Sequence, residues 1–157
     1  MKVELWAIGK TNERYLEEGM ALYEKRLKHY LPFQWSVLPD IKGAGSLSAQ
    51  QVKAKEGESI LSKLKDDDLL ILLDERGRSF SSEGFATYLD KKLQQSQRRL
   101  IFLIGGAYGF SDALYERAKD QLSLSSMTFS HQMVRLFFME QLYRAMTILR
   151  NEPYHNA

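Results

Sequence analysis

The fold is decided by the stretch Leu69-Leu70-Ile71-Leu72-Leu73-Asp74, in which five apolar residues run together before an acidic one. A run of this length suits a β-strand that is covered on both faces, because a strand with one solvated face would alternate apolar and polar residues. The segment Leu100-Ile101-Phe102-Leu103-Ile104 repeats the pattern and stops at Gly105-Gly106. Two such strands predict a mainly parallel sheet with helices on both faces.

The rest of the chain alternates in the way that such a sheet requires. Further strands are expected at residues 3–8, 33–38 and 121–124, and Arg76-Gly77-Arg78 is expected to form a turn. Helices are expected to begin near Asn12, near Ser48 with Gln51 as a capping box, at Ser81 or Ser82, at Ser111, and at His131. The sequence therefore predicts the α/β class, and without a linker or repeat it predicts one domain over residues 1–157.

The composition narrows the possible functions. The chain has 157 residues, a net charge of +2 and no cysteine, so disulfides and thiolate metal sites are excluded and no metal is expected. No signal peptide or membrane-spanning segment is visible, and we expect a cytoplasmic protein. The weak positive charge predicts that one chain alone would hold RNA loosely.

Three predicted strand ends could form a ligand site, since ligands of parallel sheets bind at the carboxyl ends of the strands. They are residues 73–77, residues 104–109, and residues 124–129. The glycines after Ile104 let a backbone approach a ligand, or they simply make a tight turn. Their spacing matches neither the dinucleotide fingerprint nor the phosphate-binding loop, so a nicotinamide cofactor is disfavoured. Residues 124–129 interleave serine and threonine with apolar residues, which suits either an adenine pocket or a polar loop with buried anchors.

The last predicted helix, residues 131–149, is apolar on most sides. Such a helix either fills a core or packs against a second subunit, and at the end of this chain we expect a dimer face. A narrow polar stripe carries Gln132, Arg135, Glu140 and Arg144. The last two can also form an ordinary surface ion pair, since they stand four residues apart.

The tail, residues 151–157, contains Pro153-Tyr154-His155. Chain ends are usually mobile and carry little chemistry. Proline stiffens this one, however, and an aromatic ring beside an imidazole makes an economical pair for contacting a nucleobase.

These segments together resemble the SPOUT methyltransferases. More closely, the chain is similar over its whole length to the bacterial family that methylates N3 of a pseudouridine in large-subunit (23S) ribosomal RNA, ribosomal RNA large subunit methyltransferase H. The similarity includes residues 73–77, 104–109, 127–132, 140–145 and 153–155. Position 130 departs from the pattern, because the family usually has proline where this chain has Ser130.

The resemblance implies a trefoil knot in the carboxyl-terminal half, a homodimer, and S-adenosylmethionine as cofactor. It implies that the cofactor contacts Leu73, Gly105, Leu124, Ser125, Ser126, Met127, Thr128 and Phe129. Resemblance and chemistry together suggest that His155 accepts the N3 proton, with Glu140 as the alternative base. Tyr154 would contact the uracil ring and Arg144 would stabilise charge on a ring carbonyl oxygen.

Two alternatives remain open at this point. One is a non-catalytic, ribosome-associated dimer that keeps the fold, and the other is a generic nucleotide-binding protein, which the missing phosphate motif disfavours. For an enzyme, the weak net charge favours rRNA within the assembled ribosome as the substrate.

Overall fold

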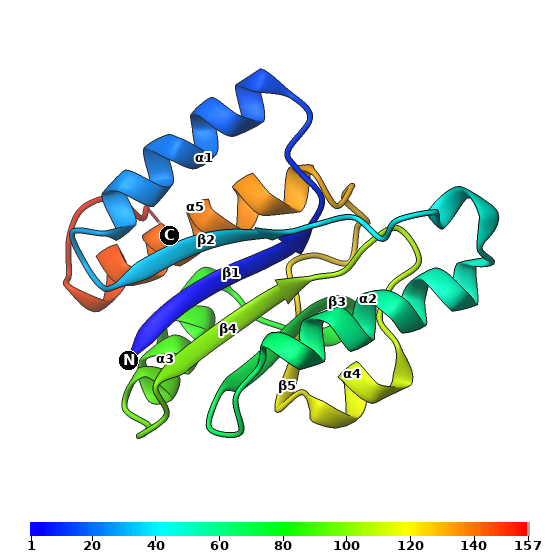
Figure 1. Ribbon diagram of the computed structural model, residues 1–157. Coiled ribbons are helices and arrows are strands. Elements are labelled where there is room, and N and C mark those ends of the chain that lie inside the picture. Colours follow the sequence, from blue (N-terminus) through cyan, green and yellow to red (C-terminus); the bar gives the residue numbers. More distant parts are fainter. Residues whose placement is uncertain (157) are drawn as a thin grey trace.

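Five parallel strands form the centre of the molecule. The computed structural model describes residues 1–156, so Ala157, the last residue of the predicted tail, lies outside the described residues. The strands are β1 (Lys2–Ile8), β2 (Phe33–Leu38), β3 (Leu69–Ser79), β4 (Arg99–Ile104) and β5 (Asp120–Ser123). They lie in the order β2-β1-β4-β3-β5, and every pairing is parallel (Figure 1). The predicted α/β class with a parallel sheet is confirmed.

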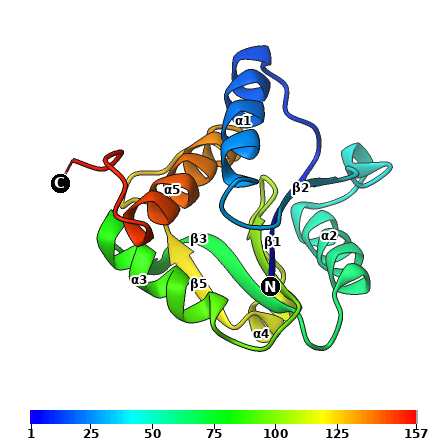
Figure 2. The same cartoon turned by 90° about the vertical axis from the view of Figure 1, so that its left-hand side faces the viewer.

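Helices cover both faces of the sheet, as predicted (Figure 2). The helices α1 (Arg14–Leu27), α3 (Ser82–Leu93) and α5 (Met133–Leu149) pack on one face, while α2 (Ala49–Lys63) and α4 (Asp112–Arg117) pack on the other. Successive residues of the central strands alternate between these two cores: Phe102 points into the first and Leu103 into the second, and both are fully buried. This double burial explains the uninterrupted apolar runs.

The helix starts are set mostly by serine caps. Ser48 and Gln51 form the predicted capping box, and Ser81 and Ser111 each accept a hydrogen bond from a backbone N–H of their helix. The predicted cap at Asn12 is wrong. Glu13 occupies the cap position of α1 without a side-chain bond, and the backbone N–H of Asn12 donates to Gln132 Oε1 at 2.9 Å. The bond that the structure shows at Asn12 is therefore with a residue 120 positions away in the chain.

The turn predicted at Arg76-Gly77-Arg78 is also wrong, because β3 continues through it to Ser79. Both Leu73 and Arg78 pair with Leu122 of β5, so the residues between them form a bulge. A Cβ at Gly77 would lie 2.5 Å from the backbone of Gln121, which explains why glycine stands at the close of this bulge.

Helix α5 lies between α1 and α3, and both pack against it. This placement accounts for much of its all-round apolar character within one chain. Arg135, expected on the polar stripe of this helix, is fully buried. Its guanidinium donates to the carbonyls of Ile8 and Gly9 and to Thr11 Oγ1, at 2.9, 2.8 and 3.1 Å. The trefoil knot stays a prediction.

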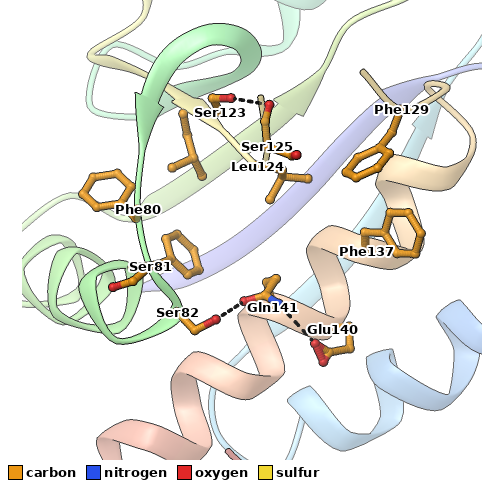
Figure 3. Close-up of a pocket in the computed structure, with 12 residues that line it drawn as sticks. Phe80, Ser81, Ser82, Ser123, Leu124, Ser125, Phe129, Phe137, Glu140 and Gln141 are labelled. Atoms are coloured by element: carbon orange, nitrogen blue, oxygen red, sulfur yellow. Dashed lines mark hydrogen bonds between the residues drawn. The ribbon is translucent and has the colours of Figure 1, made fainter. Parts of the chain in front are cut away.

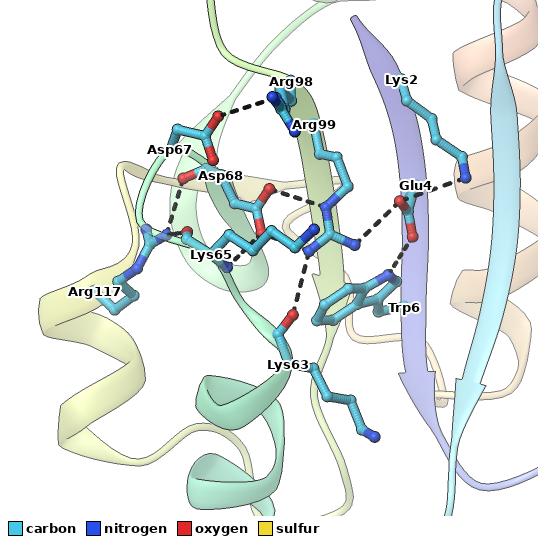
Figure 4. A network of polar contacts seen from close by, with 10 residues as sticks. All are labelled: Lys2, Glu4, Trp6, Lys63, Lys65, Asp67, Asp68, Arg98, Arg99 and Arg117. Atoms are coloured by element: carbon cyan, nitrogen blue, oxygen red, sulfur yellow. Dashed lines mark hydrogen bonds and ion pairs between the residues drawn. The ribbon is translucent and has the colours of Figure 1, made fainter.

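A polar network closes the amino end of the sheet (Figure 4). Arg99 donates to both carboxylate oxygens of Asp68 at 2.9 and 2.6 Å and to Glu4 at 3.3 Å. Glu4 also accepts from the indole N–H of Trp6 at 2.9 Å. Burial alone would raise the pKa of Asp68, but hydrogen bonds from Arg99 and from the backbone of Lys65 outweigh it and lower that pKa.

Candidate functional site

The carboxyl ends of β3, β4 and β5 surround a cavity of about 720 Å³, which we call the edge cavity. Seven of the eight residues predicted to contact a cofactor line it: Leu73, Gly105, Leu124, Ser125, Met127, Thr128 and Phe129. Ser126 is the exception and is not among the lining residues. The structure therefore brings together residues from three separate strand ends, as the rule for parallel sheets predicts.

The loop after β5 is shaped by its own polar side chains. Ser123 Oγ donates to the carbonyl of Ser125 at 3.0 Å, and Ser125 Oγ accepts from the backbone N–H of Met127 at 3.0 Å. Thr128 Oγ1 then donates to Glu75 Oε2 at 2.7 Å, which ties the loop to the bulge of β3. The serines and threonine that looked like possible ligand groups thus also hold the loop in place.

The bulge of β3 supplies the opposite wall through a second polar group. The Tyr115 hydroxyl donates to Asp74 and accepts from Arg76 Nη2 at 2.8 Å. The backbone N–H of Arg76 donates to Asp74 Oδ1 at 2.9 Å. Burial, followed by the bond to Asp74, raises the pKa of Tyr115, so this hydroxyl stays protonated at neutral pH.

Gly105 and Gly106, which follow β4, line the edge cavity with backbone atoms alone. A Cβ at Gly105 would lie 3.1 Å from the Phe110 ring, and one at Gly106 would lie 2.8 Å from the Glu56 carboxylate. Burial raises the pKa of that carboxyl group, with the charge of Asp40 adding to the effect. Gly105 therefore does more than make a tight turn, because a side chain there would press on the buried Phe110 ring.

A second cavity of about 580 Å³, which we call the side cavity, adjoins the first (Figure 3). It runs from the end of β5 to the beginning of α3 and the middle of α5, and both cavities are lined by residues 122–125 and by Phe129. Phe129 packs edge-on against Phe137 with ring centroids 5.0 Å apart. Glu140 and Gln141 form the far wall.

The three predicted catalytic residues lie together beyond that wall. Arg144 donates to Glu140 through Nε at 3.1 Å and Nη2 at 3.0 Å, which confirms the ion pair expected from their spacing. Arg144 Nη1 lies 3.1 Å from His155 Nδ1, and its guanidinium carbon lies 4.8 Å from the centre of the Tyr154 ring. The Tyr154 hydroxyl lies 3.3 Å from Glu140 Oε2.

Tyr154 and His155 of the tail thus contact side chains of their own chain. Tyr154 also approaches the Tyr23 hydroxyl at 3.3 Å, and His155 Nε2 lies 2.8 Å from Glu83 Oε1. Among the described residues, however, none of the tail lines the edge cavity. One chain therefore assembles the predicted cofactor residues and the predicted catalytic residues as two separate groups.

Three side-chain contacts that hold these groups in place were not visible in the sequence. Glu75 holds Thr128, Glu83 holds His155, and Arg135 joins the start of α5 to the end of β1. Each acts across at least 50 residues of chain, so no local pattern could have revealed it. The place of Glu83 in the first turn of a helix is a local signal, but it suits any acidic residue.

Within residues 1–156 no cluster of side chains could hold a metal ion. The same residues contain no helix with the length and apolar character needed to cross a bilayer.

Comparisons with known proteins agree with this geometry. The family model described as "Predicted SPOUT methyltransferase" matches residues 1–155. A "Ribosomal RNA large subunit methyltransferase H" of Parabacteroides distasonis is 55% identical over 156 residues, with 99% of each chain covered. The protein of the same name from Flavobacterium johnsoniae is 56% identical over the same length and coverage.

A solved structure shares the fold at much lower identity. It is a probable methylase family protein from Haemophilus influenzae Rd KW20, with a TM-score of 0.54 and 15% identity. The alignment covers 95% of this chain and 66% of that one. With a family match over 155 residues, relatives more than half identical over nearly all of their length, and a shared parallel fold, the chain belongs to the SPOUT methyltransferase family.

Proposed function

We propose that residues 1–157 form one domain, with the trefoil knot of its family, that transfers a methyl group from S-adenosylmethionine to N3 of a pseudouridine in large-subunit ribosomal RNA. The observation that carries the proposal is the edge cavity, because one space gathers seven of the eight residues expected to contact the cofactor. The names of the relatives from Parabacteroides distasonis and Flavobacterium johnsoniae supply the rRNA substrate. A protein that acts on ribosomes works in the cytoplasm.

The residues of the edge cavity fit this cofactor. A volume of about 720 Å³ lies within the range of small-molecule sites, which also combine apolar walls with a few polar groups. Leu73, Leu124 and Phe129 can enclose an adenine ring, and the backbone of the 124–129 loop can hydrogen-bond its edge. When bound, S-adenosylmethionine supplies a methyl group on a sulfonium, which is a strong electrophile.

The tail provides the groups that the pyrimidine needs. N3 of pseudouridine carries a proton that must leave, and His155 is the group we assign to receive it. Burial, followed by the bond to Tyr23, raises the pKa of Tyr154, so its hydroxyl remains a donor beside the ring. Arg144 faces both of them and can stabilise negative charge on a ring carbonyl oxygen.

Glu140 is the weaker candidate for the base. Its carboxylate accepts two hydrogen bonds from Arg144, one from Gln141 at 3.4 Å and one from Tyr154 at 3.3 Å. An acceptor with four donors around it has little capacity left for a substrate proton. We assign it the task of holding Arg144.

Dimerisation would bring the two groups of residues together. Phe129 and Phe137 are exposed large apolar side chains that line the side cavity, and Met127, which lines the edge cavity, is 74% exposed. Exposed apolar patches of this kind mark protein contacts. We propose a homodimer that covers this patch and sets the tail of one protomer over the edge cavity of the other.

Two measurements test the proposed function. Calorimetry with S-adenosylmethionine should show binding, whereas a non-catalytic dimer that only keeps the fold should show no heat. Methyl transfer should then be compared on naked rRNA, free large subunits and whole ribosomes, with the methylated atom located by mass spectrometry. We expect N3 modification of the assembled particle, and efficient modification of naked rRNA would contradict the ribosomal substrate.

A further inference from the structure

We propose that Glu83 is a positioning residue that fixes the tautomer of His155 and holds its ring so that Nδ1, and not Nε2, receives the substrate proton. The inference rests on the proposed function, since it assumes that His155 is the base. The carboxylate stands at the beginning of α3, far in sequence from the tail, and none of the resemblances or comparisons assigns it a role.

The two neighbours of the imidazole determine where its proton is. Arg144 Nη1 lies 3.1 Å from Nδ1, and Glu83 Oε1 lies 2.8 Å from Nε2. A guanidinium can only donate, so Nδ1 must accept with its lone pair. The neutral ring therefore carries its proton on Nε2 and donates it to Glu83.

The place of Glu83 in the fold keeps its carboxylate charged. It stands in the first turn of α3, two residues after the Ser81 cap. A hydrogen bond from its own backbone N–H, followed by the bond with His155, lowers the pKa of Glu83. An ionised acceptor at this point is what a ring needs when it is about to become a cation.

Arg144 can release Nδ1 without leaving its site. Its Nε and Nη2 stay bound to Glu140, while Nη1 is the one nitrogen that faces the imidazole. The guanidinium stays in place, and the imidazole moves off Nη1 as the pyrimidine enters, so that Nη1 donates to a ring carbonyl oxygen and the Nδ1 lone pair becomes free. The N3 proton then passes to Nδ1, and the electron pair left on N3 forms the bond to the methyl carbon as its bond to sulfur breaks. Glu83 stabilises the resulting imidazolium through Nε2, and solvent later removes the proton.

Substitutions at Glu83 can separate its effect on the His155 ring from an effect on the stability of the protein. Glu83→Ala removes the acceptor, while Glu83→Gln keeps an oxygen that can accept from Nε2. Glu17→Ala is the matched control, because Glu17 is an exposed acidic residue in the first turn of α1. The readouts are the ¹⁵N chemical shifts of the imidazole nitrogens of His155, assigned with His155→Ala, and the separate values of kcat and KM for methyl transfer.

We expect the Nε2–H tautomer in the unaltered protein and in Glu83→Gln. We expect a mixture of tautomers in Glu83→Ala, because the ring loses its anchor at Nε2 and no longer stays against Nη1 of Arg144. We expect kcat to fall 10- to 100-fold in Glu83→Ala with KM for the cofactor unchanged, and to recover most of that loss in Glu83→Gln. The Glu17 control should match the unaltered protein in both readouts. An unchanged tautomer or an unchanged kcat in Glu83→Ala would overturn the proposal. The two readouts decide different questions. Absence of methyl transfer in the unaltered protein would refute the proposed function. The NMR measurement needs no turnover, so it would still show whether Glu83 sets the tautomer of His155.

Discussion

The two ends of the central sheet are built from the same strands but differ in their polar contacts and in their exposure. At the amino end, Arg99, Asp68 and Glu4 close a network in which each charge meets its opposite, and Asp68 is only 5% exposed. At the carboxyl end, the strands open into two adjoining cavities, and large apolar side chains such as Met127 face outward. Substitutions at the amino end should therefore act on stability, and substitutions at the carboxyl end on binding and turnover.

The largest effect is expected at the tail. His155→Ala should lower kcat by about 100- to 10,000-fold, the usual contribution of a positioned general base. The melting temperature should stay the same, because the ring contacts only groups near the surface. Methyl-transfer kinetics and thermal unfolding of the same preparation check both halves. A lowered melting temperature in His155→Ala would contradict the expectation that the carboxyl end of the sheet serves turnover and not stability.

Arg135 is the exception to this assignment of stability to the amino end and function to the carboxyl end. It lies at the carboxyl end of the sheet, yet it is fully buried. Arg135→Met should cost about 3 kcal/mol, since it leaves buried carbonyls of Ile8 and Gly9 without a donor. Urea unfolding measures the loss, and Arg14→Met, an exposed site on α1, serves as the control. A loss below about 1 kcal/mol would show that water replaces the guanidinium easily.

The amino-end network predicts a dependence on pH. Asp68→Asn should cost about 2 kcal/mol at pH 7, less than a fully buried pair because Arg99 is partly exposed. The pKa of Asp68 is lowered in the folded state, so its stabilisation is complete above the unfolded pKa and is lost as pH falls through the folded pKa. The unfolding free energies of the two proteins should begin to converge as pH falls below about 4 and should meet below the folded pKa of Asp68. A difference that persists at pH 2 would mean that the charge of Asp68 is not its source.

The smallest effect is expected at the loop after β5. Thr128→Val keeps the side-chain shape and removes the hydrogen bond to Glu75. Because this bond is exposed, we expect a stability change below about 0.5 kcal/mol and a cofactor Kd raised about two- to fivefold. Calorimetry gives the Kd, and Thr87→Val, on the surface of α3, is the control. An unchanged Kd would show that the loop holds its shape without this bond.

The sequence predicted those features that depend on neighbouring residues. The bounds of β2, the capping box at Ser48 and the ion pair of Glu140 with Arg144 all follow from local spacing. The double burial of β3 and β4 likewise follows from their uninterrupted apolar runs.

The errors arose where a distant partner decides the structure. Gly77 between two arginines looks like a turn, yet pairing with β5 keeps it in a strand. Asn12 looks like a cap, yet Glu13 holds the cap position, and the backbone of Asn12 is bound by the distant Gln132. Arg135 looks like a surface residue on a polar stripe, but the carbonyls that it binds belong to β1.

The bulge of β3 makes one wall of the edge cavity adjustable. The residues on either side of it, Leu73 and Arg78, both pair with Leu122 of β5, so residues 74–77 lie outside the strand pairing. Exchanging or lengthening residues 74–76 would reshape the pocket while the ladder on either side stays in register, provided that Gly77 remains. For protein engineering, this segment is the place to alter which cofactor analogues are accepted, and a small library at these three positions is the natural starting point.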